Sequence, residues 1–131
     1  MLIQGFHHLA IQVRDLERAA AFYCGVIGLS EQVRHYREDG TLRSIWLEVP
    51  GGGFVALEAC AAAAAPEEAF REDAPGLHLV ALRIDPAARA EIERELERQA
   101  VPIVHRTRWT LYVRDPEGNR IGLSHHPLDA P

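Results

Sequence analysis

Residues 7–29, "HHLAIQVRDLERAAAFYCGVIGL", contain the pattern that decides the fold. Residues 8–13 alternate between apolar and other side chains, which is typical of a strand with one buried face. Asp15 then offers a helix N-cap, and apolar residues recur at helical spacing as far as Gly28, where a glycine can end the helix. The stretch predicts a strand followed by a helix, with His8 on the polar face of the strand.

The same order of elements occurs twice along the chain. In the first half, further strands are predicted at 29–38, 41–49 and 54–60. In the second half, the pattern predicts a strand at 77–84, a helix at 85–100, and strands at 103–109, 110–115 and 120–126. We therefore expect one domain over residues 1–131, with module one at 5–60, a connector at 61–76 and module two at 77–126. A half of this size is marginally stable alone, so the modules should share a core within one chain or between two.

Composition excludes several classes of protein. The chain has 131 residues, of which 47% are hydrophobic and 25% are charged, as in a soluble globular protein. Its net charge is -5 and no Lys/Arg-rich block stands out, which argues against nucleic-acid binding. No apolar run approaches the roughly 18 residues of a membrane helix, and no signal peptide is recognised, so a cytoplasmic location is expected.

Two motifs carry a resemblance to a known group. The pattern H-L-A-I-x-V-x-D-L…F-Y…G at 8–28 and "DPEGNR" at 115–120, set in two β-α-β-β-β modules, resemble the vicinal-oxygen-chelate superfamily. That group includes lactoylglutathione lyases, extradiol dioxygenases, and bleomycin- and fosfomycin-resistance proteins. The resemblance covers nearly the whole chain. It implies an α+β fold in which two βαβββ modules form a curved mixed sheet around a cleft, with helices outside.

The resemblance also implies where metal ligands would lie. In metal-using members each module gives one ligand early in its first strand and one in its last strand. In module one these positions fall on His8 and Glu58, which could hold a divalent ion such as Zn, Ni, Fe or Mn. In module two they fall on Leu79 and Gly122, neither of which is a metal ligand. His78 is one residue out of phase, so strand alternation predicts that it faces the helix side unless a β-bulge turns it.

The candidate site residues leave alternatives open. His8 is either a metal ligand or a cleft residue that hydrogen-bonds Glu58, and this pair could also act as a catalytic general base. Trp46 and Phe54 would form an aromatic wall for a flat ligand, or else pack in a dimer interface. The remaining predicted ligand-binding residues are Leu79, Tyr112 and Ser124. Arg83 and Arg114 could meet an anionic substrate group or be solvated, and His105, His125 and His126 are expected at the surface.

Two main functions follow from these residues. The first is a small-molecule binding protein of this superfamily with an incomplete metal site. The alternative is a divalent-metal-dependent lyase, isomerase or dioxygenase that acts on a small oxygen-rich substrate. A third hypothesis is a metal-free acid–base enzyme that uses His8 and Glu58. A homodimer is expected because each module leaves an exposed sheet edge.

Overall fold

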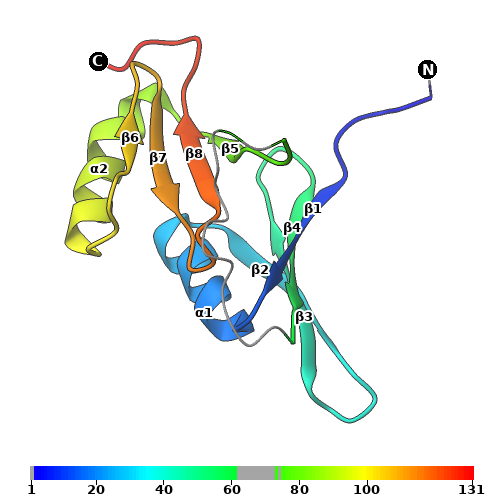
Figure 1. Cartoon of the computed structure of the whole chain (residues 1–131). Coiled ribbons are helices and arrows are strands. Elements are labelled where there is room, and N and C mark those ends of the chain that lie inside the picture. The colour runs from blue at the N-terminus through cyan, green and yellow to red at the C-terminus, as the bar shows by residue number, and fades with distance from the viewer. Residues whose placement is uncertain (1, 62–72, 74) are drawn as a thin grey trace. The chain divides into compact units, whose positions relative to one another are not determined.

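The two βαβββ modules of an α+β fold are confirmed (Figure 1). The computed structural model describes residues 2–61, 73 and 75–131. The chain forms two compact units, residues 1–65 and 66–131, and each contains one four-stranded mixed sheet. Most of the connector expected at 61–76 lies outside the described residues.

The first unit follows the predicted order of elements. Its elements are β1 (His8–Val13), α1 (Leu16–Ala20), η1 (Ala21–Val26), β2 (Ser30–Tyr36), β3 (Leu42–Glu48) and β4 (Phe54–Ala59). The strand order is β1-β4-β3-β2, with β1 parallel to β4 and the other neighbours antiparallel.

The helical segment of the first unit changes its winding halfway. The Asp15 carboxylate accepts a hydrogen bond from the Arg18 backbone N–H at 3.0 Å and caps α1, as predicted. The segment η1 is a π-helix, and the Ile27 N–H donates to the Phe22 carbonyl, five residues back, at 3.1 Å. Gly28 ends the segment with a φ of 91°, a conformation that glycine adopts without strain.

One face of this sheet forms the core with α1. Helix α1 contacts β3 and β4, and the apolar side chains on that face are buried: Val13, Ile45, Leu47, Val55 and Leu57. Strand alternation therefore directs the residues between them, such as Trp46 and Phe54, to the face that α1 does not cover.

The second unit repeats the arrangement. Its elements are β5 (Val80–Arg83), η2 (Pro86–Ala88), α2 (Arg89–Arg98), β6 (His105–Arg106), β7 (Thr110–Arg114) and β8 (Arg120–Ser124). The strand order is β5-β8-β7-β6, with β5 parallel to β8. Its buried core contains Leu96, Leu111, Val113, Ile121 and Leu123.

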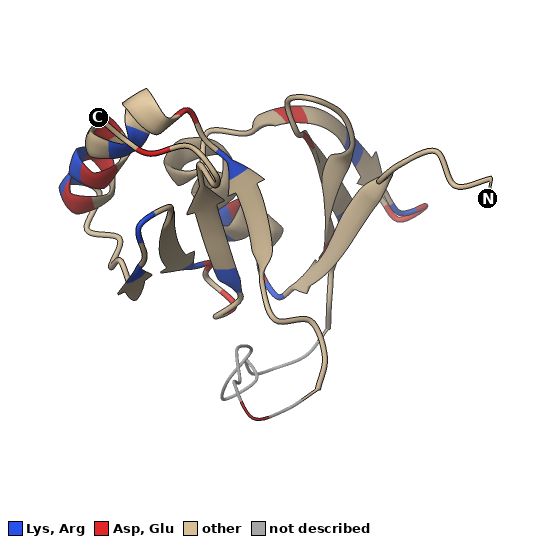
Figure 2. Ribbon diagram, turned by 90° about the horizontal axis from the view of Figure 1, so that it is seen from above, with Lys and Arg blue, Asp and Glu red and all other residues tan. Residues whose placement is uncertain are grey.

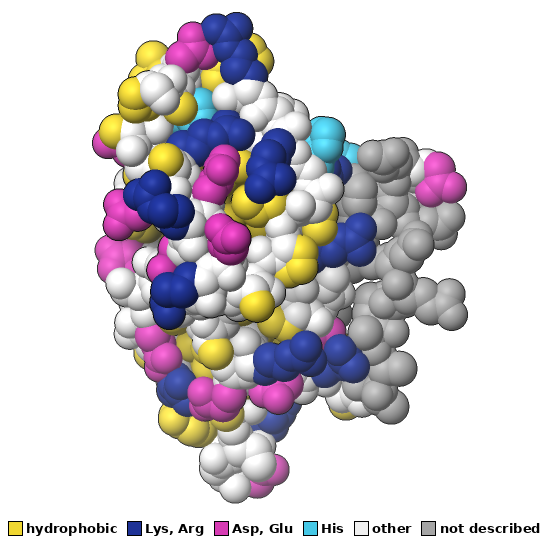
Figure 3. All heavy atoms as spheres, turned by 90° about the vertical axis from the view of Figure 1, so that its left-hand side faces the viewer, with side chains coloured by type: hydrophobic (Ala, Val, Ile, Leu, Met, Phe, Trp, Pro, Cys, Tyr) yellow, Lys and Arg dark blue, Asp and Glu magenta, His cyan; other side chains and the backbone are white. Residues whose placement is uncertain are grey.

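Helix α2 presents a charged outer face. Figure 2 shows acidic and basic residues along it, and Figure 3 shows side chains of both signs mixed over the surface where α2 lies. The Glu95 carboxylate accepts hydrogen bonds from Arg98 at 2.5 and 2.9 Å, a helix-surface pair of the expected kind. No helix in the described part of the chain has the length and hydrophobicity to span a bilayer.

The expectation that His125 lies at the surface is wrong, since its side chain is only 2% exposed. The chain turns back after β8, where the Leu128 N–H donates to the His125 carbonyl at 2.9 Å. Arg89 Nη1 lies 3.1 Å from His125 Nε2, and His125 Nδ1 contacts the Leu128 carbonyl. His125 therefore has a structural role, because it anchors the C-terminal segment against α2.

Candidate functional site

The first unit carries a row of rings on the face that α1 leaves uncovered. His35, Trp46, Phe54 and His8 follow one another across β2, β3, β4 and β1. The ring centroids are 4.5 Å apart for His35 and Trp46, 4.5 Å for Trp46 and Phe54, and 4.7 Å for Phe54 and His8. The structure thus brings Trp46 and Phe54 together and adds a histidine at each end. We call these four residues the aromatic row.

Buried polar atoms lie beside the aromatic row. Ser44 Oγ, His35 Nε2 and Trp46 Nε1 are buried and have no hydrogen-bond partner among the described residues. Ser44 pairs with His35 on one side and with Glu58 on the other. A buried polar atom left unsatisfied costs about 1–3 kcal/mol, so a buried water that bonds these atoms would recover that cost. The row therefore combines an apolar wall with a polar border.

His8 and Glu58 share a face but are not neighbours. In the parallel pair of β1 and β4, His8 lies opposite Phe54, and Glu58 lies opposite Gln12. The four-residue offset between Phe54 and Glu58 corresponds to roughly 13 Å along the strand. His8 Nδ1 instead lies 2.8 Å from His7 Nδ1. At this separation the Glu58 carboxylate cannot orient the His8 imidazole, so the geometry does not favour a catalytic pair.

The parallel strand pairs of the two modules show which residues of one module correspond to which residues of the other. Ala10 pairs with Ala56 in the first sheet, and Ala81 pairs with Gly122 in the second. Because both pairs lie two residues beyond the first-ligand position of their module, Gly122 corresponds to Ala56. Glu58 lies two residues further along β4.

The donor set does not fit a metal centre of the implied kind. Of the four corresponding positions, His8 has a metal-binding side chain, whereas the other three are Ala56, Leu79 and Gly122. A Cβ on Gly122 would lie 3.3 Å from Thr110 Cγ2 and 3.5 Å from Tyr112 Cε1. The Tyr112 ring thus occupies the space that a longer side chain would need. Within the described residues, no three His, Cys, Asp or Glu side chains are grouped to hold a metal ion.

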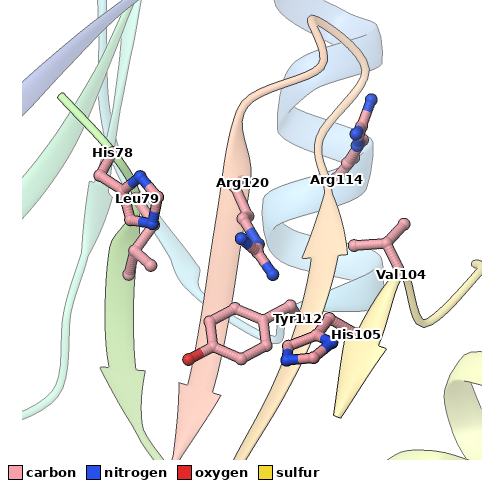
Figure 4. A pocket seen from close by; sticks show the side chains of 7 residues that line it. All are labelled: His78, Leu79, Val104, His105, Tyr112, Arg114 and Arg120. Carbon is pink, nitrogen blue, oxygen red and sulfur yellow. The ribbon is translucent and has the colours of Figure 1, made fainter. Parts of the chain in front are cut away.

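The second unit contains a pocket of about 500 Å³ (Figure 4). It lies over the face of the sheet that carries Tyr112 and Arg120, and its lining includes His78, Leu79, His105, Tyr112, Arg114 and Arg120. The volume is in the range of small-molecule sites. Two of the residues predicted to bind ligand, Leu79 and Tyr112, are therefore brought together here.

Three side chains form the floor of this pocket. The Arg120 guanidinium carbon lies 4.2 Å from the centroid of the Tyr112 ring, within cation–π distance. The His105 ring lies on the other side of Tyr112, with centroids 5.5 Å apart. Figure 4 shows the Arg120 guanidinium directed at the Tyr112 ring and His105 beside that ring. The floor is consequently both aromatic and basic.

The predicted helix-side position of His78 is wrong. His78 lines the pocket together with Leu79. Strand β5 begins at Val80, two residues later, so His78 precedes the sheet ladder and strand alternation does not fix its direction. No β-bulge is needed to bring it to the pocket.

Ser124 lies on β8, as Arg120 does, but it is not one of the described residues that line this pocket. Its Oγ accepts a hydrogen bond from Thr110 Oγ1 at 2.9 Å. Arg83, which pairs with Ser124, is likewise outside the lining that the structure describes. Ser124 thus acts within the sheet, between β7 and β8.

Sequence reasoning did not select Arg120, His105 or His35 as site residues. For Arg120 a signal existed, because it alternates with Gly122 and Ser124 along the last strand. The strand that contains His105 has two residues, too few for a periodic pattern. Cross-strand pairing places His105 opposite Tyr112, and only the folded sheet reveals this.

The fold is that of a two-module βαβββ protein, and its second unit has a pocket of small-molecule size. The chain belongs to the Glyoxalase/Bleomycin resistance protein/Dioxygenase superfamily, whose sequence profile matches residues 7–109. No match was found among curated protein sequences.

Solved structures share the fold at low identity. A glyoxalase/dioxygenase from Nostoc punctiforme has a TM-score of 0.75 and 22% identity, over 93% of this chain and 90% of that one. Lactoylglutathione lyase from Agrobacterium tumefaciens has a TM-score of 0.69 and 24% identity, over 96% of each chain. A mutant of the fosfomycin resistance protein FosX from Listeria monocytogenes, complexed with Mn(II) and 1S,2S-dihydroxypropylphosphonic acid, has a TM-score of 0.73 and 17% identity, over 97% and 96%.

Proposed function

We propose that this protein binds a flat organic small molecule on the aromatic row of its first unit. The observation that carries the proposal is the continuous series of rings His35, Trp46, Phe54 and His8, each within 4.7 Å of the next. Neighbouring rings of the row cover one another's faces, so their edges would form the apolar surface on which a planar ligand lies in edge-to-face contact.

The alternative function is a divalent-metal-dependent lyase, isomerase or dioxygenase. It draws support from His8, which stands at the first ligand position implied by the superfamily, and from the FosX mutant, which is complexed with Mn(II). A divalent ion would supply Lewis-acid polarisation of a substrate oxygen. The side chains of Ala56, Leu79 and Gly122 offer no ligand atoms, so His8 alone of the four positions could hold such an ion.

Planar probes test the aromatic row. We would titrate quinoline and 2-naphthol, which are uncharged at neutral pH, into the full-length chain and follow binding by saturation-transfer NMR and calorimetry. Phe54→Ala removes the middle of the row and should weaken binding about tenfold, because edge-to-face contact with a probe ring and its burial contribute more than 1 kcal/mol.

The matched control is Tyr36→Ala, which removes an exposed aromatic side chain at the C-terminal end of β2, directly after His35. Tyr36 belongs to none of the ring contacts of the row, so this variant should bind the probes like the native chain. Equal loss of binding in both variants, or no binding by the native chain, would overturn the proposal.

We also propose a homodimer and a cytoplasmic location. Strands β1 and β2 stand at the two edges of the first sheet, and β5 and β6 at the edges of the second, so each sheet has unpaired strand edges of its own. Size-exclusion chromatography with light scattering should report twice the mass of 14.6 kDa at micromolar concentration. A monomer mass would contradict the dimer without affecting the ligand proposal.

A further inference from the structure

The pocket of the second unit differs in charge from the chain as a whole. The chain carries 19 acidic and 14 basic residues other than histidine, for a net charge of -5. The described lining of the pocket includes two arginines and two histidines, and none of its members is acidic. A local reversal of charge in a pocket of about 500 Å³ indicates recognition of a negatively charged group.

The two arginines are placed directly opposite each other. Arg114 on β7 pairs with Arg120 on β8, and both line the pocket. Figure 4 shows the Arg120 guanidinium directed toward Tyr112 and the Arg114 guanidinium directed the other way, so the two donors reach different parts of the lining. Two guanidinium groups in the lining of one pocket make its potential positive and attract an anion to it. The Arg114 side chain makes no hydrogen bond or ion pair within the part of the chain described here.

Tyr112 and Gly122 hold Arg120 in position. Since Gly122 has no side chain, the Tyr112 ring lies across it, 3.5 Å from where a Cβ would be. The ring in turn supports the Arg120 guanidinium at 4.2 Å from its centroid. A guanidinium held against an aromatic face loses less conformational entropy when it binds a carboxylate than one on a mobile side chain.

We propose that this pocket binds the oxyanion group, a carboxylate or a phosphonate, of an organic molecule, with Arg120 and Arg114 as its principal donors. His105, beside Tyr112, adds a further ring N–H in the same pocket. The pocket is larger than a bare inorganic ion needs, which favours an anion attached to an organic body. The proposal concerns the second unit alone and does not depend on the aromatic row.

Calorimetry with matched probes tests the charge requirement. Benzoate and the uncharged benzamide have nearly the same size and shape, so their difference reports recognition of the anion. We expect benzoate to bind about tenfold or more tightly than benzamide, since hydrogen bonds to a charged acceptor are stronger than those to a neutral one. Phenylphosphonate in the same titration distinguishes a tetrahedral oxyanion from a planar one. Equal binding of benzoate and benzamide, or no benzoate binding, would overturn the proposal.

Three arginine variants locate the anion. Arg120→Gln and Arg114→Gln should each weaken benzoate binding about tenfold, because each removes one charged donor. Arg83→Gln makes the same charge change on an exposed residue of the same sheet, outside the described lining, and should leave binding unchanged. Equal effects of all three would indicate a general charge effect and overturn the proposal.

Two comparisons separate a loss of anion binding from a loss of folding and from a failure of the aromatic-row proposal. Arg114 is exposed, so Arg114→Gln tests the site even where Arg120→Gln reduces stability. Loss of quinoline binding in Phe54→Ala with benzoate binding intact would show two independent surfaces. If native protein fails to bind quinoline but binds benzoate through Arg120, the proposed function fails and the anion pocket stands; the reverse result refutes the pocket alone.

Discussion

His8 stacks on Phe54, with ring centroids 4.7 Å apart and planes at 5° to each other. The two residues are direct neighbours in the parallel pairing of β1 and β4. His8, which stands at the first metal-ligand position implied by the superfamily, therefore packs against an aromatic side chain. Its nearest carboxylate on the same strand pair, Glu58, lies beside Gln12. The side chain next to His8 across the strand pair is therefore a phenyl ring and not a carboxylate.

The stack predicts how His8 variants behave. His8→Phe should keep the stability of the native chain, whereas His8→Ala should lose about 0.5 kcal/mol, the low end for an aromatic pair because His8 is exposed. Urea unfolding measures both. Native protein purified without a histidine tag should contain substoichiometric metal by mass spectrometry, and His8→Ala should not change it. Stoichiometric Zn, Ni, Fe or Mn that disappears in His8→Ala would favour the metal-dependent alternative.

A second prediction concerns the stability of a variant at Gly122. In Gly122→Ala the new Cβ would meet Thr110 Cγ2 at 3.3 Å, so the neighbouring side chains must shift. We expect a loss of about 1 kcal/mol in the free energy of unfolding, the low end for overpacking. Gly25→Ala is the matched control, because a Cβ there meets no atom within 4 Å. Equal stability of the two variants would show that Tyr112 and Thr110 do not close the position.

Ser44 should behave differently from an ordinary buried serine. Its hydroxyl is buried and has no partner among the described residues, so Ser44→Ala should leave stability unchanged or raise it by about 1 kcal/mol. The contrasting variant is Thr110→Val, which removes a hydroxyl that donates to Ser124 at 2.9 Å and should lose about 1 kcal/mol. Denaturant unfolding compares them. A clear loss of stability in Ser44→Ala would indicate a buried water or other partner.

Glu31 predicts part of the pH dependence of stability. The Arg34 guanidinium hydrogen-bonds the Glu31 carboxylate and lowers the pKa of that carboxyl. A group with a lower pKa in the folded state stabilises the fold above its unfolded pKa and loses that contribution as pH falls through the folded value. Glu31→Gln should therefore lower the urea midpoint at pH 7 and have less effect at pH 3.

The control is Glu38→Gln, which makes the same change on an exposed residue without an ion pair or hydrogen bond among the described residues. Its urea midpoint should match that of the native chain at both pH values. If Glu31→Gln shifts the midpoint equally at pH 7 and pH 3, the pair with Arg34 does not contribute through charge.

Much of the fold was predictable because its signals are local. The Asp15 cap and Gly28 lie within a few residues of the helix that they limit. Alternation along single strands placed Trp46 and Phe54 on one face, and both lie in the aromatic row. The predicted α-helix over Ala21–Val26 became a π-helix, a change that local propensity does not indicate.

The site was less predictable because it depends on pairing between distant strands. Alternation has a period of two and fixes the face of a side chain, but it does not fix the position along the neighbouring strand. Glu58 was therefore assigned to the correct face yet lies beside Gln12 rather than His8. His78 escaped alternation altogether because β5 begins after it.

The sequence by itself determined two βαβββ modules and the faces of most of their strands, and its resemblance to the superfamily implied Leu79 and Gly122 at metal-ligand positions. The tertiary structure alone decided which side chains touch: His8 with Phe54, Arg120 with Tyr112, and Arg114 opposite Arg120. The physical reason is that secondary structure follows from interactions within a few residues. Register follows from hydrogen bonds and packing between segments far apart in the chain.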